Sequence, residues 1–184
     1  MGVLGLELSD VGILVAAAEP ARLLKVDGNS VESPGFALPG KNRLIVGKAA
    51  EGKGHLYPRQ TLSQFWDELN IEPLEQPSPF AQNHVEIAFA HFAHIWQTVK
   101  QHGKEMVIAV PSFYNKEHLG LILGITQELG IPVKGFIPQA VAAVPEQLPE
   151  GLLLHLDLHL HRFEVSRLER GEQLSQKDSI AAEG

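Results

Sequence analysis

The stretch MVIAVPSFYNKEHLGLILGITQELGIPVKGFI, residues 106–137, decides the fold class. It begins with an unbroken apolar run at residues 106–110, which is typical of a strand buried on both faces. Asn115 is suited to cap a helix that runs over residues 116–129. A second strand is expected at residues 132–137. The stretch therefore predicts a strand–helix–strand unit of an α/β protein.

Further strands are expected on the N-terminal side of this unit. Residues 3–8 and 13–17 have the pattern of a hairpin, and residues 22–26 that of a third strand. An apolar stripe at helical spacing predicts a long helix over residues 83–101. Three antiparallel strands followed by alternating helices and strands are the order of the ribonuclease H-like fold. We therefore expect an α/β protein with a mixed sheet flanked by helices.

Three other segments have weaker patterns. Residues 61–70 are expected to form a helix, and residues 71–79, with three prolines, to form a linker. Residues 139–144 predict a short alanine-rich helix. The tail from residue 171 onward has no clear periodicity.

The segment LDLHLHRFEVS, residues 156–166, marks the last predicted hairpin. Apolar residues occupy even positions before its centre and odd positions after it, and such a slip indicates a turn or bulge. The hairpin is expected to pair residues 152–158 with residues 163–169. Its turn, residues 159–162, contains neither glycine nor proline, the residues that form tight turns most easily.

The composition limits the classes of function. The chain has 184 residues, of which 44% are hydrophobic and 20% charged, as in soluble globular proteins. A net charge of −7 argues against nucleic acid as a partner. The absence of cysteine excludes thiolate chemistry and fits a reducing cytoplasm. No apolar run is long enough to cross a membrane, and no basic leader precedes the first apolar strands. We expect a cytoplasmic protein without a membrane segment.

Separate segments of the chain resemble the seventy-kilodalton heat-shock chaperones, which belong to the actin-like ATPase superfamily. Residues 107–144, VIAVPSFYNKEHLGLILGITQELGIPVKGFIPQAVAAV, resemble their central segment, where V-P-x-x-(F/Y)-N leads into a helix and N-E-P-x-A-A-A forms another. GLELSDVGILVA, residues 5–16, is similar to their first phosphate loop. LDLHLHRFEVS is similar to the second, F-D-L-G-G-G-T-F-D-V-S. Residues 33–65 also resemble an early region of these chaperones.

The resemblance implies an actin-like ATPase fold. Residues 1–150 would be the first ribonuclease H-like half of such a domain. Residues 151–184 would be the opening hairpin of an incomplete second half. A hairpin without its neighbours leaves sheet edges unpaired, which favours pairing with another chain. We therefore expect a homodimer through residues 152–169, or another protein partner or client.

The same resemblance implies a site for ATP or ADP with Mg²⁺ between the two loops. The loop positions that would contact this cofactor are Ser9, Asp10, Val11, Gly12, His159, Leu160, His161 and Arg162. The family's glycines are replaced in the second loop, so side chains occupy space that a phosphate would use. Asp10 would in addition repel a polyphosphate.

The catalytic positions are also altered. The remnants of the family's catalytic set are Glu7, Asp157, Glu164 and Gln139, of which Gln139 cannot act as a carboxylate base. Asp157 and Glu7 would be the ligands of a metal ion. Phosphoryl transfer needs placed cations and preorganised phosphate contacts. We therefore expect a degraded ATPase site without efficient hydrolysis.

Three functions stay open at this point. The first is a chaperone-like, non-catalytic module for binding, scaffolding or regulation, which the loss of the loop glycines favours. The second is a functional ATP-binding domain of heat-shock-chaperone type, which the retained acids favour. The third is a metal- or anion-binding domain around His159, His161 and Asp157, whose residue types suit a first-row metal.

Histidines also recur on the long predicted helix. His84, His91 and His94 are spaced at helical intervals, but no glutamate follows them as in a zinc-protease helix. We expect them to be ordinary residues of the helix surface.

Overall fold

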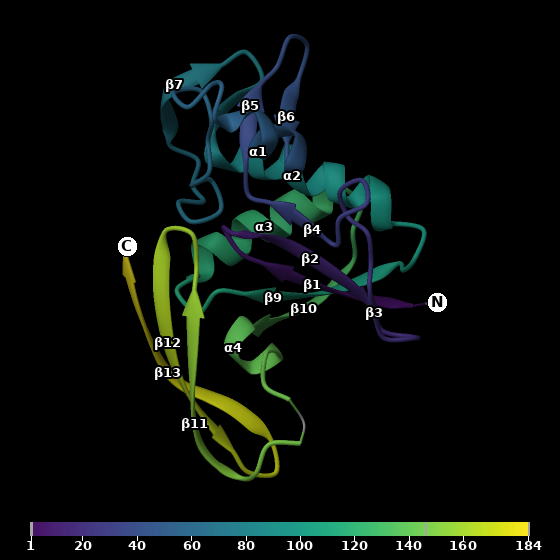
Figure 1. Ribbon diagram of the computed structural model, residues 1–184. Coiled ribbons are helices and arrows are strands. Elements are labelled where there is room, and N and C mark those ends of the chain that lie inside the picture. Colours follow the sequence, from purple (N-terminus) through teal and green to yellow (C-terminus); the bar gives the residue numbers. More distant parts are fainter. Residues whose placement is uncertain (1, 146, 184) are drawn as a thin grey trace.

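The computed structural model describes residues 2–145 and 147–183 (Figure 1). In these residues, thirteen strands and four helices follow one another along the chain. The first ten strands and all four helices form a body built on one mixed sheet. The last three strands form a separate sheet, drawn in yellow-green and yellow at the lower left of Figure 1.

The central sheet combines antiparallel and parallel pairs. Its strands are β1 (Val3–Leu8), β2 (Gly12–Ala17), β3 (Arg22–Leu23), β4 (Glu32–Pro34), β9 (Glu105–Val110) and β10 (Val133–Pro138). They lie in the order β10-β9-β1-β2-β3, and β4 pairs with β2 as well. β1 is antiparallel to β2 and parallel to β9, which is parallel to β10. The predicted N-terminal hairpin and the two strands of the strand–helix–strand unit are confirmed.

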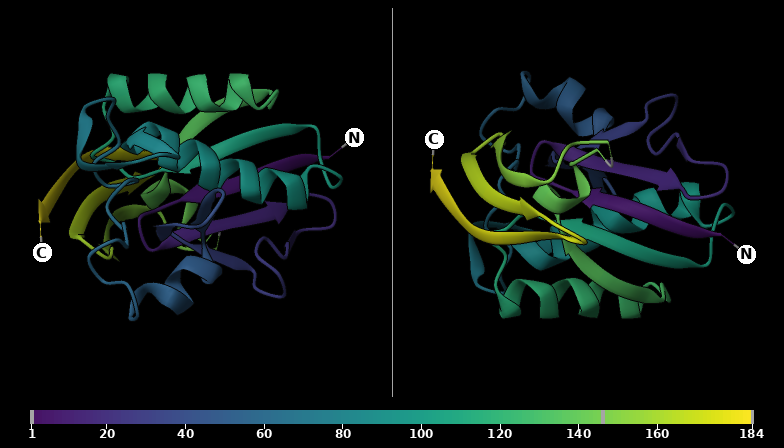
Figure 2. Two further views of the ribbon diagram at one scale, coloured as in Figure 1. Left: turned by 90° about the horizontal axis from the view of Figure 1, so that it is seen from above. Right: turned by 90° about the horizontal axis from the view of Figure 1, so that it is seen from below.

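Two long helices cover one face of this sheet. They are α2 (His84–Val99) and α3 (Lys116–Glu128), and the short α4 (Gln139–Ala142) lies on the opposite side (Figures 1 and 2). Apolar side chains of both long helices share one core with the inward residues of the strands. Asn83 and Asn115 cap α2 and α3, because each side chain accepts hydrogen bonds from N–H groups of the first turn. The predicted long helices are confirmed.

The segment between β4 and α2 forms two small hairpins and one helix. These elements are β5 (Ala37–Pro39), β6 (Leu44–Val46), α1 (Lys48–Gly54), β7 (Pro73–Ser78) and β8 (Ala81–Asn83). The predicted helix over residues 61–70 is wrong, because this segment is irregular and instead buries Phe65 and Trp66 in the core. The predicted linker at residues 71–79 is wrong too, since most of it is strand β7. Tertiary burial and pairing override local propensity in both places.

The C-terminal sheet has three antiparallel strands in the order β11-β12-β13. They are β11 (Gly151–Leu158), β12 (Arg162–Arg170) and β13 (Leu174–Glu183). The predicted hairpin is confirmed, but the expectation of a tail without a pattern is wrong, because it forms β13. A register shift between Arg167 and Leu168 interrupts the pairing of β12 with β13. Such a bulge hides the alternation that would mark a strand in the sequence.

The expected ribonuclease H-like, actin-like ATPase fold is wrong. Strand residues make up 41% and helix residues 22% of the chain, and the strands are divided among several small separate sheets. The chain is a small mixed α/β domain. The order of strands and helices misled the prediction, since it does not tell which strands share a sheet. β5 pairs with β6 and β7 with β8 as two hairpins, and β11 to β13 form a sheet of their own.

Candidate functional site

The turn of the C-terminal sheet is held by Asp10, which lies in the loop between β1 and β2. The Asp10 carboxylate accepts hydrogen bonds from the backbone N–H groups of Leu160, at 3.2 Å, and His161, at 2.9 Å. The side chain is buried, with 4% of the residue exposed. Within the turn, the N–H of His159 donates to the carbonyl oxygen of Arg162 at 2.8 Å. Among the described residues no side-chain-bearing residue has a positive φ, so this turn does not require glycine.

His159 lies between two carboxylates. Its Nδ1 is 3.3 Å from Oδ1 of Asp10, and its Nε2 is 3.4 Å from Oδ2 of Asp157. Burial disfavours the charged imidazole, but the hydrogen bond to Asp10 and the charge of Asp157 outweigh it and raise the pKa of His159. Burial likewise acts to raise the pKa of Asp10, but the hydrogen bonds from His159, His161 and Leu160 lower it on balance. The pair therefore favours an ionised Asp10 beside a protonated His159.

Arg162 and His161 make structural contacts within the fold. The Arg162 Nε donates to Oδ1 of Asp67 at 2.5 Å, and the guanidinium lies 4.6 Å from the centre of the Phe113 ring. The hydrogen bond to Asp67 raises the pKa of Arg162. The ring of His161 is hydrogen bonded to the hydroxyl of Ser63 at 3.2 Å. These contacts attach the turn to the segment between α1 and α2.

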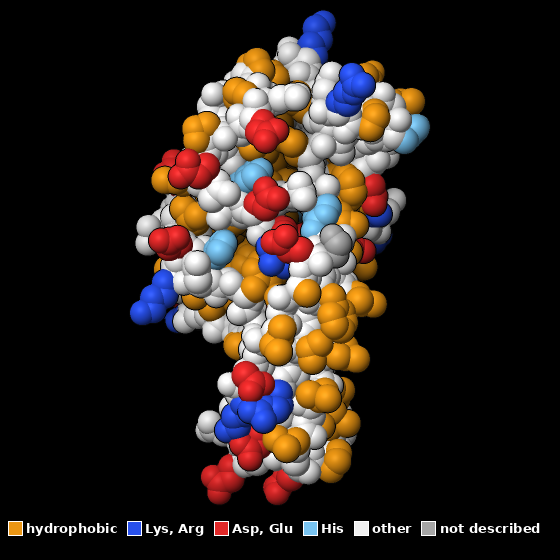
Figure 3. Space-filling model, turned by 90° about the vertical axis from the view of Figure 1, so that its left-hand side faces the viewer, with side chains coloured by type: hydrophobic (Ala, Val, Ile, Leu, Met, Phe, Trp, Pro, Cys, Tyr) orange, Lys and Arg blue, Asp and Glu red, His pale blue; other side chains and the backbone are white. Residues whose placement is uncertain are grey.

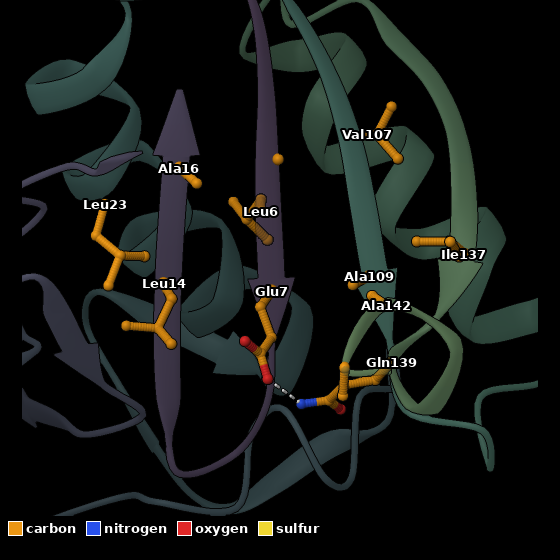
Figure 4. Close-up of a pocket in the computed structure, with 12 residues that line it drawn as sticks. Leu6, Glu7, Leu14, Ala16, Leu23, Val107, Ala109, Ile137, Gln139 and Ala142 are labelled. Atoms are coloured by element: carbon orange, nitrogen blue, oxygen red, sulfur yellow. Dashed lines mark hydrogen bonds between the residues drawn. The ribbon is translucent and has the colours of Figure 1, made fainter. Parts of the chain in front are cut away.

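Glu7 and Gln139 meet at the end of an apolar cavity on the open side of the central sheet. The Gln139 Nε2 donates to Oε1 of Glu7 at 2.6 Å (Figure 4). The cavity has a volume of about 380 Å³ and is lined mainly by side chains of the strands, among them Leu14, Val107 and Ile137. In Figure 4 the side chains of Glu7 and Gln139 meet at the lower end of the cavity, with Leu6, Val107 and Ile137 above them.

Glu164 lies opposite Asp157 in the pairing of β11 with β12 and joins the two sheets. It is buried, its Oε2 accepts a hydrogen bond from the backbone N–H of Ser112 at 3.1 Å, and its Oε1 accepts one from the Ser166 hydroxyl at 3.0 Å. Ser112 follows the end of β9, so this carboxylate ties β12 to the central sheet. Such contacts are those of a structural residue.

The remaining predicted residues partly come together. Glu7, Ser9, Val11, Gly12, Gln139, Asp157 and His159 line a small polar cavity of about 190 Å³. Leu160, His161 and Arg162 do not line it, because their backbone or side chains are directed to Asp10, Ser63 and Asp67. Within residues 2–145 and 147–183 there is no group of three or more acidic and imidazole side chains placed to hold a metal ion. The metal ligands Asp157 and Glu7 stay a prediction.

The expectation that the helix histidines are surface residues is wrong for His91, which has 0% exposure. The Trp66 indole N–H donates to its Nδ1 at 3.0 Å, so Nε2 carries the proton and donates to the Ser33 hydroxyl at 2.9 Å. That hydroxyl donates to Asp27 at 2.9 Å. Burial in the core, together with the nearby His94, lowers the pKa of His91 to about 3. Position at the edge of the apolar stripe was the only sequence signal for this network.

The outer face of the C-terminal sheet is apolar and exposed. We call it the leucine face and define it by residues with 39% to 76% exposure, namely Leu152, Leu154, Leu156, Leu158, Phe163 and Ile180. The register places Leu156 beside Val165 and Val165 beside Ile180, so the face extends over all three strands. Figure 3 shows hydrophobic side chains gathered along this part of the molecule. The opposite face carries Glu164, Ser166 and Leu168, which are buried against the body.

Comparisons with protein-family models and with curated proteins find no match to this chain. The resemblance to heat-shock chaperones therefore stays a prediction from the sequence. The described helices are all too short or too polar to cross a membrane.

Proposed function

We propose that this chain is a non-catalytic protein-binding module whose turn at residues 159–162 no longer receives a nucleotide. One observation carries the proposal: the carboxylate of Asp10 accepts the backbone N–H groups of Leu160 and His161. Successive backbone N–H groups in a turn are the usual receptors of phosphate oxygens. In this chain the Asp10 carboxylate, and not a phosphate, accepts these N–H groups.

Displacement of Asp10 by a phosphate would be unfavourable. The hydrogen bonds lower the pKa of Asp10 despite its burial, so the carboxylate stays ionised at neutral pH and repels an incoming anion. Arg162 is paired with Asp67, so its charge is already neutralised and it would contribute little to binding a phosphate. Gln139 stands where the family has a glutamate. Its amide donates to Glu7 and is not basic enough to accept a proton from water.

The binding part of the proposal is supported by the leucine face. Monomeric proteins rarely expose large contiguous apolar patches unless these are sites of interaction. The face lies on a sheet whose inner side is fixed to the body by Glu164, so it is presented on a rigid support. The resemblance of residues 107–144 to heat-shock chaperones is the reason to propose a chaperone-like role, in the cytoplasm.

The experiment for the non-catalytic part is calorimetric titration with ATP and ADP, with and without Mg²⁺. We expect no heat of binding from the wild-type chain. The contradicting result is micromolar, Mg²⁺-dependent binding of nucleotide that Asp157→Ala weakens. It would reject the non-catalytic part of the proposal and favour the ATP-binding alternative.

The experiment for the binding part is the fluorescence of an apolar dye such as anilinonaphthalene sulfonate at low protein concentration. We expect Leu156→Asp to lower the signal, and Leu56→Asp to leave it unchanged. Leu56 is the matched control, because it is 63% exposed like Leu156 but follows α1, outside the leucine face. Equal signals from both variants would contradict the proposal.

A further inference from the structure

We infer that the occupant of the leucine face is a second copy of this chain, packed face to face on the same surface. This inference rests on the proposed function, since it names the partner of the same binding surface. It differs from pairing at a sheet edge. Addition of a strand to β11 would satisfy backbone groups but leave Leu152, Leu154, Leu156 and Leu158 in water.

The charges beside the face are paired within the chain and sum to zero. The register puts Arg167 beside Leu154 on the outer side of the sheet, where its Nη2 lies 2.6 Å from Oδ2 of Asp178. At the same end of the sheet, Lys177 Nζ lies 2.6 Å from Oε2 of Glu169. Two cations and two anions cancel, although the whole chain carries −7. Two copies can therefore approach by this face without the repulsion that their net charge creates elsewhere.

The shape of the face also suits a second sheet. Leucines at every second residue of β11 form one row, and the side chains of Val165 and Ile180 continue the surface across β12 and β13. Two such sheets can interdigitate their side chains at a separation of about 10 Å. An interface between identical patches is the form that a two-fold dimer requires.

The size of the face predicts a weak dimer. Three strands spaced about 4.8 Å apart, with about seven residues each at 3.4 Å, span roughly 14 by 24 Å. A standard stable interface involves about 20–30 residues on each partner, more than the six that define the leucine face. Association should therefore depend on concentration and reverse on dilution.

Sedimentation velocity over a range from micromolar to millimolar tests the inference. The wild-type mass should rise from 20.1 kDa towards twice that value. Leu156→Asp should weaken association by at least about ten-fold, as expected for a charge placed at the centre of an apolar interface. Leu56→Asp, of equal exposure, should associate like the wild type.

Single-cysteine variants test the geometry, because the chain has no cysteine of its own. Val165 lies in the middle strand at the centre of the face, so a two-fold axis through the face brings Val165 near its own copy. A short bismaleimide should join Val165→Cys chains into covalent dimers and leave Leu56→Cys chains monomeric. Equal cross-linking of the two variants would overturn the face-to-face arrangement.

The outcomes separate the inference from the proposed function. Suppose that the wild-type mass stays at 20.1 kDa at every concentration and that Leu156→Asp still lowers the dye fluorescence. The leucine face would then be a binding surface, but its partner would be another protein and not a second copy of this chain. Loss of association from Leu56→Asp and Leu156→Asp alike would also overturn the inference. Absence of both dimer and dye binding would reject the proposed function itself.

Discussion

Replacing Asp10 with asparagine should loosen the turn of the C-terminal sheet. The carboxylate accepts two N–H groups, from Leu160 and His161, and faces the imidazole of His159. Asparagine has the same shape but no charge, and only one of its two terminal atoms accepts a hydrogen bond. Hydrogen bonds to a charged group contribute about 1.5–3 kcal/mol each. Since the neutral amide costs less to bury, we expect Asp10→Asn to lower the free energy of unfolding by about 2–4 kcal/mol.

Urea denaturation followed by tryptophan fluorescence measures this loss. Asp178→Asn is the matched control, because it removes a carboxylate from an exposed ion pair with Arg167. Exposed pairs contribute little, so the control should change stability by no more than about 1 kcal/mol. If Asp10→Asn lowers the free energy of unfolding by no more than Asp178→Asn does, Asp10 does not hold the turn.

The same pair predicts a pH window for this contribution. The lowered pKa of Asp10 stabilises the fold above pH 3.8, the ordinary value, and this contribution disappears as the pH falls through the folded pKa. The raised pKa of His159 stabilises the fold fully below pH 6.5 and this contribution disappears as the pH rises through the folded pKa. The difference between wild type and Asp10→Asn should therefore be largest between about pH 4 and 6.5. A difference that grows steadily above pH 6.5 would contradict this assignment.

Three further variants test the packing that positions the site. The pKa of His91 is about 3, so between pH 3 and pH 6.5 only the unfolded chain binds a proton at this residue. In this range the free energy of unfolding of the wild type should fall with decreasing pH by about 1.4 kcal/mol per pH unit more than that of His91→Gln. Parallel pH profiles of the two proteins in urea denaturation would contradict this. Tyr114→Phe should cost about 1–2 kcal/mol, because the buried hydroxyl donates to the carbonyl oxygen of Trp66 at 2.5 Å; an unchanged urea midpoint would show that the bond contributes nothing. Asn115→Ala should cost about 1 kcal/mol through loss of the N-cap of α3, and an unchanged thermal midpoint would argue against the cap.

The elements that could be predicted are those whose signals are local. The strand at residues 106–110, the cap at Asn115 and the stripe of α2 depend on neighbouring residues, and the structure confirms all three. The phase slip in residues 156–166 likewise marks a real turn, which lies between β11 and β12.

Other features depend on contacts distant in the sequence. Asp10 and His161 are 151 positions apart, and no local pattern shows that one carboxylate meets the turn of another sheet. His91 lies at the edge of the apolar stripe of α2, which does not show whether it is buried. Its burial depends on hydrogen bonds to Trp66 and Ser33, which are distant in the sequence. Alternation in β11 indicates two different faces but does not tell which of them is covered.

The most direct test of the central claim is the amide spectrum of the turn during a titration with Mg²⁺ and ATP. The N–H resonances of Leu160 and His161 report directly on the acceptor that these groups contact. If Asp10 holds the turn, both resonances stay in place up to millimolar nucleotide in the wild type. If both shift and saturate together, the nucleotide displaces Asp10, and the proposal that this turn does not bind a nucleotide is wrong.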